Sequence, residues 1–471
     1  MRGTKRRIAG VRWIGALVVL LVAASCVQGP VVPSSGISLA TGFDISQVGY
    51  QRTEFFLNGN ARSYAPVAPI PADGKLQVAP DPLVSAGNYK TRFVAFRPTD
   101  PAKFNGTVIV EWLNVTTGQD LATDWLMAHN ELIRSGYAWV GVSAQAVGVN
   151  QIKATNPSRY GTLFHPGDSY SYDIFSHAGA RVRDHAATVL GGLVPERVIA
   201  TGQSQSASRL VTYIDAVHPL SNVYDGFLVH SRGVSGSSLR QAPLASVPFP
   251  SPAPIRDDLD VPVMVVQAEG DVIGSNLLSR QPDTALIRTW ELAGTAHADS
   301  YTFSVGGSDI GDGNGAIQMF GFMQSPQVLG CAKPINAGPH HWQLQAAVHH
   351  LDVWVRTGNG PPVGDLLEVA STSPVVLVRD AQGNALGGVR SPHVDAPIAR
   401  LDGINSGGSF CGLFGSTTPL SSAELLALYP THDDFVNAWA ASLYQSIVDG
   451  FILPADGWEL LGAAVLSTVP N

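Results

Sequence analysis

Short apolar runs alternate with amphipathic stretches through the middle of the chain. Runs typical of buried strands lie at residues 107–112, 137–142, 197–200, 225–229, 261–267 and 287–292. Stretches with helical periodicity lie between them, at residues 120–134, 177–190 and 206–217. Strands that alternate with helices favour a mostly parallel central sheet with helices on both faces. The pattern therefore predicts an α/β fold, preceded by strand-like residues 43–96.

Two segments interrupt this alternation. Residues 231–260 are rich in Ser, Pro and Arg, and residues 301–345 are rich in Gly. Insertions of this kind fold over the active sites of enzymes as lids, which is the role we expect for both. An amphipathic helix is expected at residues 343–356. From about residue 370 a C-terminal extension follows, with a hairpin near residues 380–384 and helices near 421–428, 433–449 and 457–466.

The N-terminus has the pattern of an export signal. Five basic residues and no acidic residue lie within positions 1–12, and an apolar stretch runs from 13 to 24. That run is shorter than the roughly 20 residues that a membrane-spanning helix needs. Residues 23–26 resemble a bacterial lipobox, in which Cys26 becomes lipid-modified after cleavage; ordinary cleavage and release is the alternative. We expect a signal at 1–25, a flexible tether at 26–41 and one folded domain at 42–471.

Composition and charge narrow the class of partner. Apolar residues make up 45% of the chain, which allows a large core and argues against disorder. Loss of the five positive charges of the signal takes the net charge from −8 to −13. A mature protein this acidic, with no basic run after Arg12, is a poor candidate for nucleic-acid binding. Contact with a membrane is expected only through a lipid on Cys26.

Only three cysteines occur in the sequence. Besides Cys26, Cys331 and Cys411 are left, and an exported protein keeps disulfides, so we expect a bridge between them. Two separate buried thiols are the alternative. The bridge would close a loop of about 80 residues, for which chain entropy gives roughly 4–5 kcal/mol of stabilisation. No Cys-x-x-Cys or His-Glu-x-x-His motif occurs, so no metal site is expected.

The most specific feature is a Gly-x-Ser-x-Ser sequence at residues 202–206, between the strand at 197–200 and the helix at 206–217. A strand that enters a helix through such a turn is typical of a nucleophile elbow, with Ser206 in place of the second glycine. The turn presents the hydroxyl of Ser204 at the carboxyl edge of the sheet. It also lies at a helix N-terminus, whose partial positive charge favours a developing oxyanion.

Serine needs a base, and the expected order along the chain is serine, acid, histidine. Asp271 comes shortly after the strand at 261–267 and is the expected acid, with Glu269 as the alternative. His297 lies in a Gly-containing loop after the last strand and is the expected base. The carboxyl ends of parallel strands meet at one edge of a sheet. All three candidates therefore belong to the same edge as Ser204.

Further residues are assigned to the surroundings of this site. The oxyanion hole of such enzymes combines the amide after the nucleophile, here Gln205, with one from the loop after an early strand. Asn114 or Val115 is the expected second donor. His230, at the end of a strand, and His341 are candidates for lining the substrate pocket, with structural roles as the alternative for both.

These motifs occur together in a known group of proteins. Thr-Gly-Gln-Ser-Gln-Ser at 201–206, Gln-Ala-Glu-Gly-Asp at 267–271 and Ala-Gly-Thr-Ala-His-Ala-Asp at 293–299 carry the resemblance. Gly-Pro-His-His-Trp at 338–342 and residues 410–419 and 429–434 extend it. From about Gly42 onward the chain resembles the bacterial exported alpha/beta hydrolase domain family. The resemblance implies the α/β-hydrolase fold and a Ser/acid/His triad, and little about the substrate.

The sequence thus predicts an exported serine hydrolase, either anchored in the cell envelope or secreted. We expect it to cleave small-molecule carboxylic esters through an acyl-enzyme on Ser204, without a cofactor. Two alternatives stay open. The same residues would serve an amidase, a peptidase or an acyltransferase, and the fold would also suit a cell-surface binding protein without activity.

Overall fold

The computed structural model describes residues 26–31, 40–408 and 410–470. Its centre is a nine-stranded sheet in the order β1-β2-β5-β7-β6-β8-β9-β10-β11. The strands are β1 (Cys26–Val31), β2 (Tyr50–Ala61), β5 (Gly87–Pro98), β6 (Thr107–Trp112), β7 (Ala138–Val142), β8 (Arg197–Gln203), β9 (Gly226–His230), β10 (Val263–Ala268) and β11 (Ile287–Leu292). The six strands β6 to β11 run parallel to one another, whereas β1, β2 and β5 form an antiparallel margin on one side of the sheet. The predicted α/β fold is confirmed.

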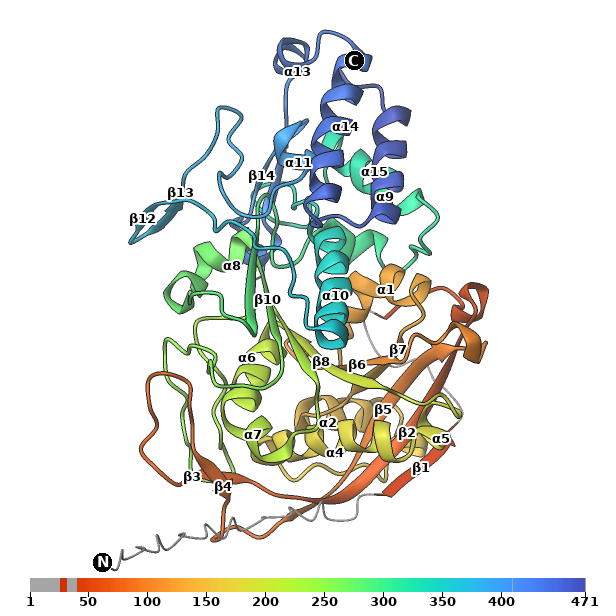
Figure 1. The fold of residues 1–471 in the computed structure, drawn as a ribbon, viewed down its shortest axis with the longest axis vertical. Coiled ribbons are helices and arrows are strands. Elements are labelled where there is room, and N and C mark those ends of the chain that lie inside the picture. The colour runs from red at the N-terminus through yellow and green to blue at the C-terminus, as the bar shows by residue number, and fades with distance from the viewer. Residues whose placement is uncertain (1–25, 32–39, 409, 471) are drawn as a thin grey trace, which may run out of the picture.

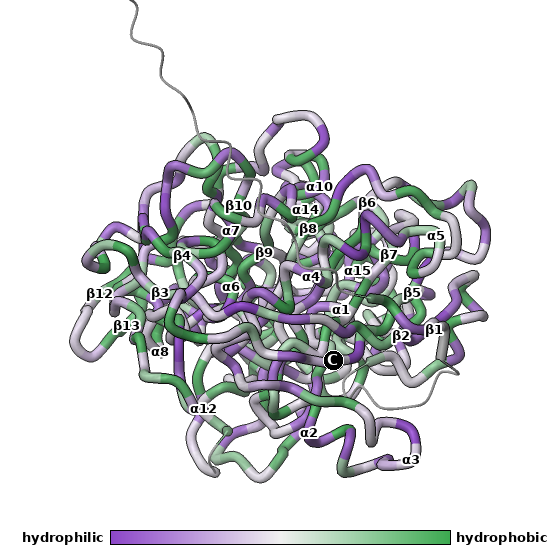
Figure 2. Tube along the Cα trace, turned by 90° about the horizontal axis from the view of Figure 1, so that it is seen from below, coloured by the Kyte–Doolittle hydropathy of each residue, from purple (hydrophilic) through white to green (hydrophobic). Residues whose placement is uncertain are grey.

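Helices cover both faces of this sheet, as a parallel sheet requires. Helices α1 (Thr123–Arg134) and α10 (His340–Thr357) lie side by side on one face (Figure 1). Helices α4 (Ser171–Asp184) and α6 (Gln205–Thr212) pack on the other face. The two faces hold separate hydrophobic clusters, and residues of β6 and β8 contribute to both. The apolar runs predicted from the sequence are thus buried on both sides. Figure 2 shows hydrophobic (green) segments of the chain running through the middle of the molecule.

The C-terminal part forms a third cluster next to the sheet. Helices α9 (Asn314–Gln324), α14 (His432–Val448) and α15 (Pro454–Leu466) pack together around Phe320, Trp439 and Leu460. Figure 1 shows this group at one end of the molecule, next to α10. Helix α9 belongs to the predicted insertion at 301–345. That insertion and the C-terminal extension therefore fold together.

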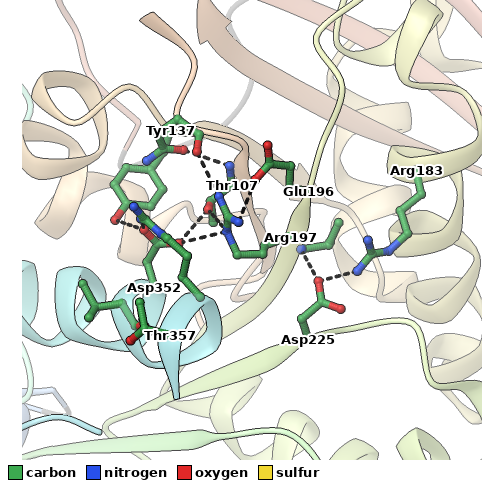
Figure 3. Close-up of polar contacts among 12 residues, drawn as sticks. Thr107, Tyr137, Arg183, Glu196, Arg197, Asp225, Asp352 and Thr357 are labelled. Carbon is green, nitrogen blue, oxygen red and sulfur yellow. Dashed lines mark hydrogen bonds and ion pairs between the residues drawn. The ribbon is translucent and has the colours of Figure 1, made fainter. Parts of the chain in front are cut away.

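The buried Asp352 and the partly exposed Asp225 make polar contacts at the amino ends of the parallel strands (Figure 3). Asp352 of α10 accepts hydrogen bonds from the Oγ1 of Thr107, at 2.6 Å, and from the hydroxyl of Tyr137, at 3.2 Å. Asp225, directly before β9, pairs with Arg183 of α4. Helix α10 begins at the opposite edge of the sheet with His340, so this one helix links the two edges.

Several predicted elements differ in detail. The helix expected at 177–190 begins earlier, at Ser171, and ends at Asp184, where a short helix α5 (Ala186–Val189) follows. The first part of the tether expected at 26–41 is instead an edge strand, because residues 26–31 pair with β2. The signal predicted at 1–25 lies outside the described residues. Among the residues described, no helix has both the length and the apolar character needed to cross a bilayer.

Candidate active site

Ser204 occupies the sharp turn between β8 and α6. Its backbone has φ 62° and ψ −117°, a conformation that L-residues rarely adopt. The amide of Ser204 donates to the carbonyl of His230 at 2.9 Å, which fixes the turn to β9. A Cβ atom on Gly202 would lie 3.0 Å from the Cβ of Ser206, so glycine is needed where strand and helix approach. This is the geometry of a nucleophile elbow.

The structure brings the three predicted triad residues together. The Oγ of Ser204 lies 2.8 Å from the Nε2 of His297, and the Nδ1 of His297 lies 2.6 Å from the Oδ1 of Asp271. His297 follows β11, and Asp271 lies in α8 (Glu269–Gly274), which follows β10 directly. Each side chain thus sits just past the carboxyl end of its own parallel strand. The arrangement allows His297 to take the hydroxyl proton while Asp271 holds the ring.

Asp271 is held in its ionised form. Burial alone would raise the pKa of its carboxyl group, but the charge of His297 and hydrogen bonds to the carboxylate bring the pKa below its ordinary value. One of these bonds comes from the amide of Ala268, which donates to Oδ2 at 2.8 Å. An anion at this position can stabilise a positive charge on the adjacent imidazole ring.

Glu269, the alternative acid, has a different role. Its side chain is fully buried and accepts hydrogen bonds from the amides of Gly294, at 2.9 Å, and Gly403, at 3.1 Å. It also pairs with Arg379 at 2.8 Å. Within the described residues, Glu269 has no hydrogen bond to His297. Burial raises the pKa of Glu269, and its contacts tie the loop after β11 to the C-terminal extension.

The oxyanion hole departs from the prediction at one residue. The backbone amide of Asn114 donates to the carbonyl of Leu121 at 3.0 Å, so it is not available to an oxyanion. The side chain of Asn114 instead donates to the carbonyl of Gln203 at 2.9 Å. Among the described residues, the amides of Gln205 and Val115 have no acceptor. Gln205 opens helix α6, where unpaired amides and the helix dipole favour an anion.

Gln203, directly before the nucleophile, is a site residue that sequence reasoning missed. Its side-chain nitrogen lies 3.2 Å from the Nε2 of His297, which is also the ring atom that contacts Ser204. The side chain is buried, and Asn114 holds its backbone carbonyl. Its place next to the serine in the Gly-x-Ser-x-Ser sequence was the only available signal.

The geometry has a counterpart in a known family. A family model described as "Alpha/beta hydrolase domain" matches residues 27–462. The chain belongs to this alpha/beta hydrolase domain family. No curated protein matches the chain significantly.

Solved structures of several hydrolases are similar to this family member. A glucuronoyl esterase from Teredinibacter turnerae has 11% identity and a TM-score of 0.27, over 57% of this chain and 74% of its own. A glucuronoyl esterase from Solibacter usitatus has 11% identity and a TM-score of 0.27, over 57% and 84%. A serine hydrolase without a lid from Xanthomonas campestris has 12% identity and a TM-score of 0.27, over 44% and 80%.

Behind the triad of this alpha/beta hydrolase lies a fully buried chain of polar side chains. The Nδ1 of His230 lies 2.7 Å from the Oδ1 of Asp124, and its Nε2 lies 2.8 Å from the Nε2 of His340. The Nδ1 of His340 lies 2.9 Å from the carbonyl of Ala296, the neighbour of the base. Because a carbonyl only accepts, His340 carries its proton on Nδ1 and accepts from His230. Burial lowers the pKa of His340 to about 3, so the ring is neutral.

A cavity of about 220 Å³ opens beside Ser204 and His297. Its other lining residues are Asn114, Thr116, Thr117, Leu121, Thr123, Gln203, Ala298, Thr302, Phe303, Phe410, Leu413 and Phe414. The predicted lid at 301–345 supplies Thr302 and Phe303. The segment at 231–260 supplies no lining residue, because it packs away from the cavity. Arg256, for example, donates to the carbonyl of Asp215 at 2.8 Å.

Two predicted lining residues are placed elsewhere. His230 is buried in the polar chain behind the triad. His341 is buried against Tyr301, with ring centroids 3.5 Å apart, and is not among the residues that line the cavity. The C-terminal extension supplies one wall of the cavity that the sequence did not predict. Phe410 directly precedes helix α12 (Cys411–Phe414), and Leu413 and Phe414 belong to this helix.

Proposed function

We propose that this protein hydrolyses carboxylic esters through an acyl-enzyme on Ser204. The observation that carries the proposal is the continuous hydrogen-bonded series from the Ser204 hydroxyl through His297 to Asp271, at a strained elbow. Membership of the hydrolase family supports it. No side chain in this series needs a cofactor to act.

In the proposed reaction, His297 takes the proton of the Ser204 hydroxyl as the oxygen attacks the ester carbonyl. The amides of Gln205 and Val115 donate to the oxyanion that forms. The tetrahedral intermediate collapses when the bond to the alcohol breaks, and His297 gives the alcohol its proton. Water then attacks the acyl group with His297 as base, which releases the acid and restores Ser204.

Active-site labelling tests this proposal directly. A fluorophosphonate probe should label the folded wild-type protein. Ser204→Ala should abolish this labelling and lower the turnover of p-nitrophenyl acetate by on the order of 10⁴-fold. Ser208→Ala is the matched control, because Ser208 lies one turn further along α6 and should leave both unchanged. Turnover that persists in folded Ser204→Ala would contradict the assignment. Matched anilides in place of esters separate esterase from amidase activity.

Export is part of the proposal. The basic and apolar pattern of residues 1–25 supports it, and so does the disulfide between Cys331 and Cys411, since disulfides persist in oxidising compartments. Cys26 is exposed, as a lipid attachment site must be. Mass spectrometry of the mature N-terminus from a bacterial envelope should find a lipid-modified Cys26, and release of an unmodified chain would favour secretion.

A further inference from the structure

Large apolar side chains are exposed around the cavity beside Ser204. Phe303, Phe410 and Leu413 expose 42%, 45% and 36% of their surface, and Phe414 and Leu121 complete this apolar wall. Apolar residues that gather at one exposed place mark a binding surface more often than scattered ones do. Here they face the atoms of the proposed nucleophile and base.

The polar members of the lining are uncharged. They are the side chains of Asn114, Gln203 and four threonines, besides Ser204 and His297 themselves. Among the described residues that line the cavity, none is Asp, Glu, Lys or Arg. A charged substrate group would therefore lose water without gaining a partner of opposite charge, which is costly in an apolar site.

The apolar wall is held in place from several sides. Helix α12 lies between β14 (Ala399–Asp402) and β15 (Ser416–Pro419), and Cys411 at its start is bonded to Cys331. The amide of Ala298, next to the base, donates to the carbonyl of Leu413 at 3.0 Å. The ring of Phe414 packs edge-on against Phe303, with centroids 4.7 Å apart. The wall is thus fixed relative to His297.

We propose that this cavity binds a neutral, short aliphatic chain of the ester, so that the substrates are uncharged esters with an apolar group beside the carbonyl. The inference rests on the proposed function and adds the substrate class. The volume of about 220 Å³ lies below the roughly 300–1,000 Å³ of pockets for drug-sized ligands, which suits a small group. The chain is either the acyl group or the alcohol of the ester.

Two substrate series identify which end of the ester enters the cavity. One varies the acyl chain in p-nitrophenyl acetate, butyrate and hexanoate, and the other varies the alcohol in ethyl, butyl and hexyl acetate. We expect kcat/KM to rise about fourfold per methylene in one series, or about fifteenfold from a two-carbon to a four-carbon chain. A sulfonate at the end of the favoured chain should lower kcat/KM on the order of a hundredfold. Equal turnover across both series would overturn the inference.

Wall variants link this preference to the cavity. Phe410→Ala should lower kcat/KM more for the four-carbon than for the two-carbon substrate of the favoured series, which reduces the fifteenfold preference to below about fivefold. Leu413→Ala should act in the same direction if the first variant does not fold. Phe164→Ala is the matched control, because this side chain is 54% exposed and lies outside the cavity. Equal losses for the two-carbon and four-carbon substrates of that series in the folded wall variants would contradict the assignment.

Failure of this inference differs from failure of the proposed function. If acetate is hydrolysed in a Ser204-dependent manner but neither series shows a preference for chain length, only the substrate class is wrong. If no ester is hydrolysed and the probe does not label Ser204, the hydrolase proposal itself is wrong.

Discussion

At the scale of single residues, His230 and His340 connect the two loops that carry Ser204 and His297, on which the proposed reaction depends. The carbonyl of His230 holds the amide of Ser204, and its side chain donates to His340. His340 in turn donates to the carbonyl of Ala296, one residue before the base. The hydroxyl and the imidazole are therefore positioned by one buried unit. A displacement of about 1 Å between reacting groups costs on the order of a hundredfold in rate.

We predict that His340→Ala lowers kcat by about tenfold to a hundredfold with little change in KM, because the carbonyl of Ala296 loses its donor and the His297 loop shifts. His340→Asn should recover part of the loss, since its amide nitrogen can occupy the position of Nδ1. Steady-state kinetics on p-nitrophenyl acetate measure both constants, with circular dichroism to verify folding. An asparagine variant no better than the alanine variant would show that the bond to Ala296 does not position the base.

At the scale of elements, local patterns carried most of what the sequence could predict. The strand, turn and helix around Ser204, the start of α8 after β10 and the loop after β11 each have a signal within about ten residues. Since parallel strands end at one edge, these loops had to meet. The wall formed by α12 has no such signal, because it depends on docking of the C-terminal extension. The engaged amide of Asn114 was also hidden, since a backbone hydrogen bond leaves no trace in side-chain identity.

The disulfide that holds α12 gives a prediction at this scale. Replacing both Cys331 and Cys411 with Ala should lower the free energy of unfolding by up to roughly 4–5 kcal/mol, because the unfolded chain regains the freedom of an 80-residue loop. Urea unfolding measures the change. Cys26→Ala is the matched control, as Cys26 is a free cysteine and should leave the unfolding midpoint unchanged. An unchanged midpoint in the double variant would mean that the bridge constrains nothing.

At the scale of the whole molecule, the C-terminal extension is joined to the sheet by a shared aromatic layer. His393 of α11 (Pro392–Asp395) lies between Trp342 of α10 and Trp439 of α14, with ring centroids 5.3 and 5.1 Å away. Burial at this junction lowers the pKa of His393 from 6.5 to about 3. The neutral ring therefore depends on the extension staying docked on the sheet.

The pH dependence of stability reports on this junction. Between pH 3 and 6.5 the unfolded chain holds a proton on His393 that the folded chain lacks, so this residue makes the free energy of unfolding rise with pH in that window. Relative to His393→Gln, the wild type should lose about 2 kcal/mol of stability between pH 7.5 and pH 5. Urea unfolding at both pH values measures the difference, and a constant difference would show that the ring titrates normally in the folded protein.

The backbone at Ser204 bears on the rival view of an inactive binding protein. Glycine would adopt φ 62° without strain, whereas a serine there costs of order 1–3 kcal/mol. A protein that needed only the shape of this turn would fold more easily with glycine at position 204. The strain at Ser204 therefore favours a chemical use of its hydroxyl over the inactive alternative.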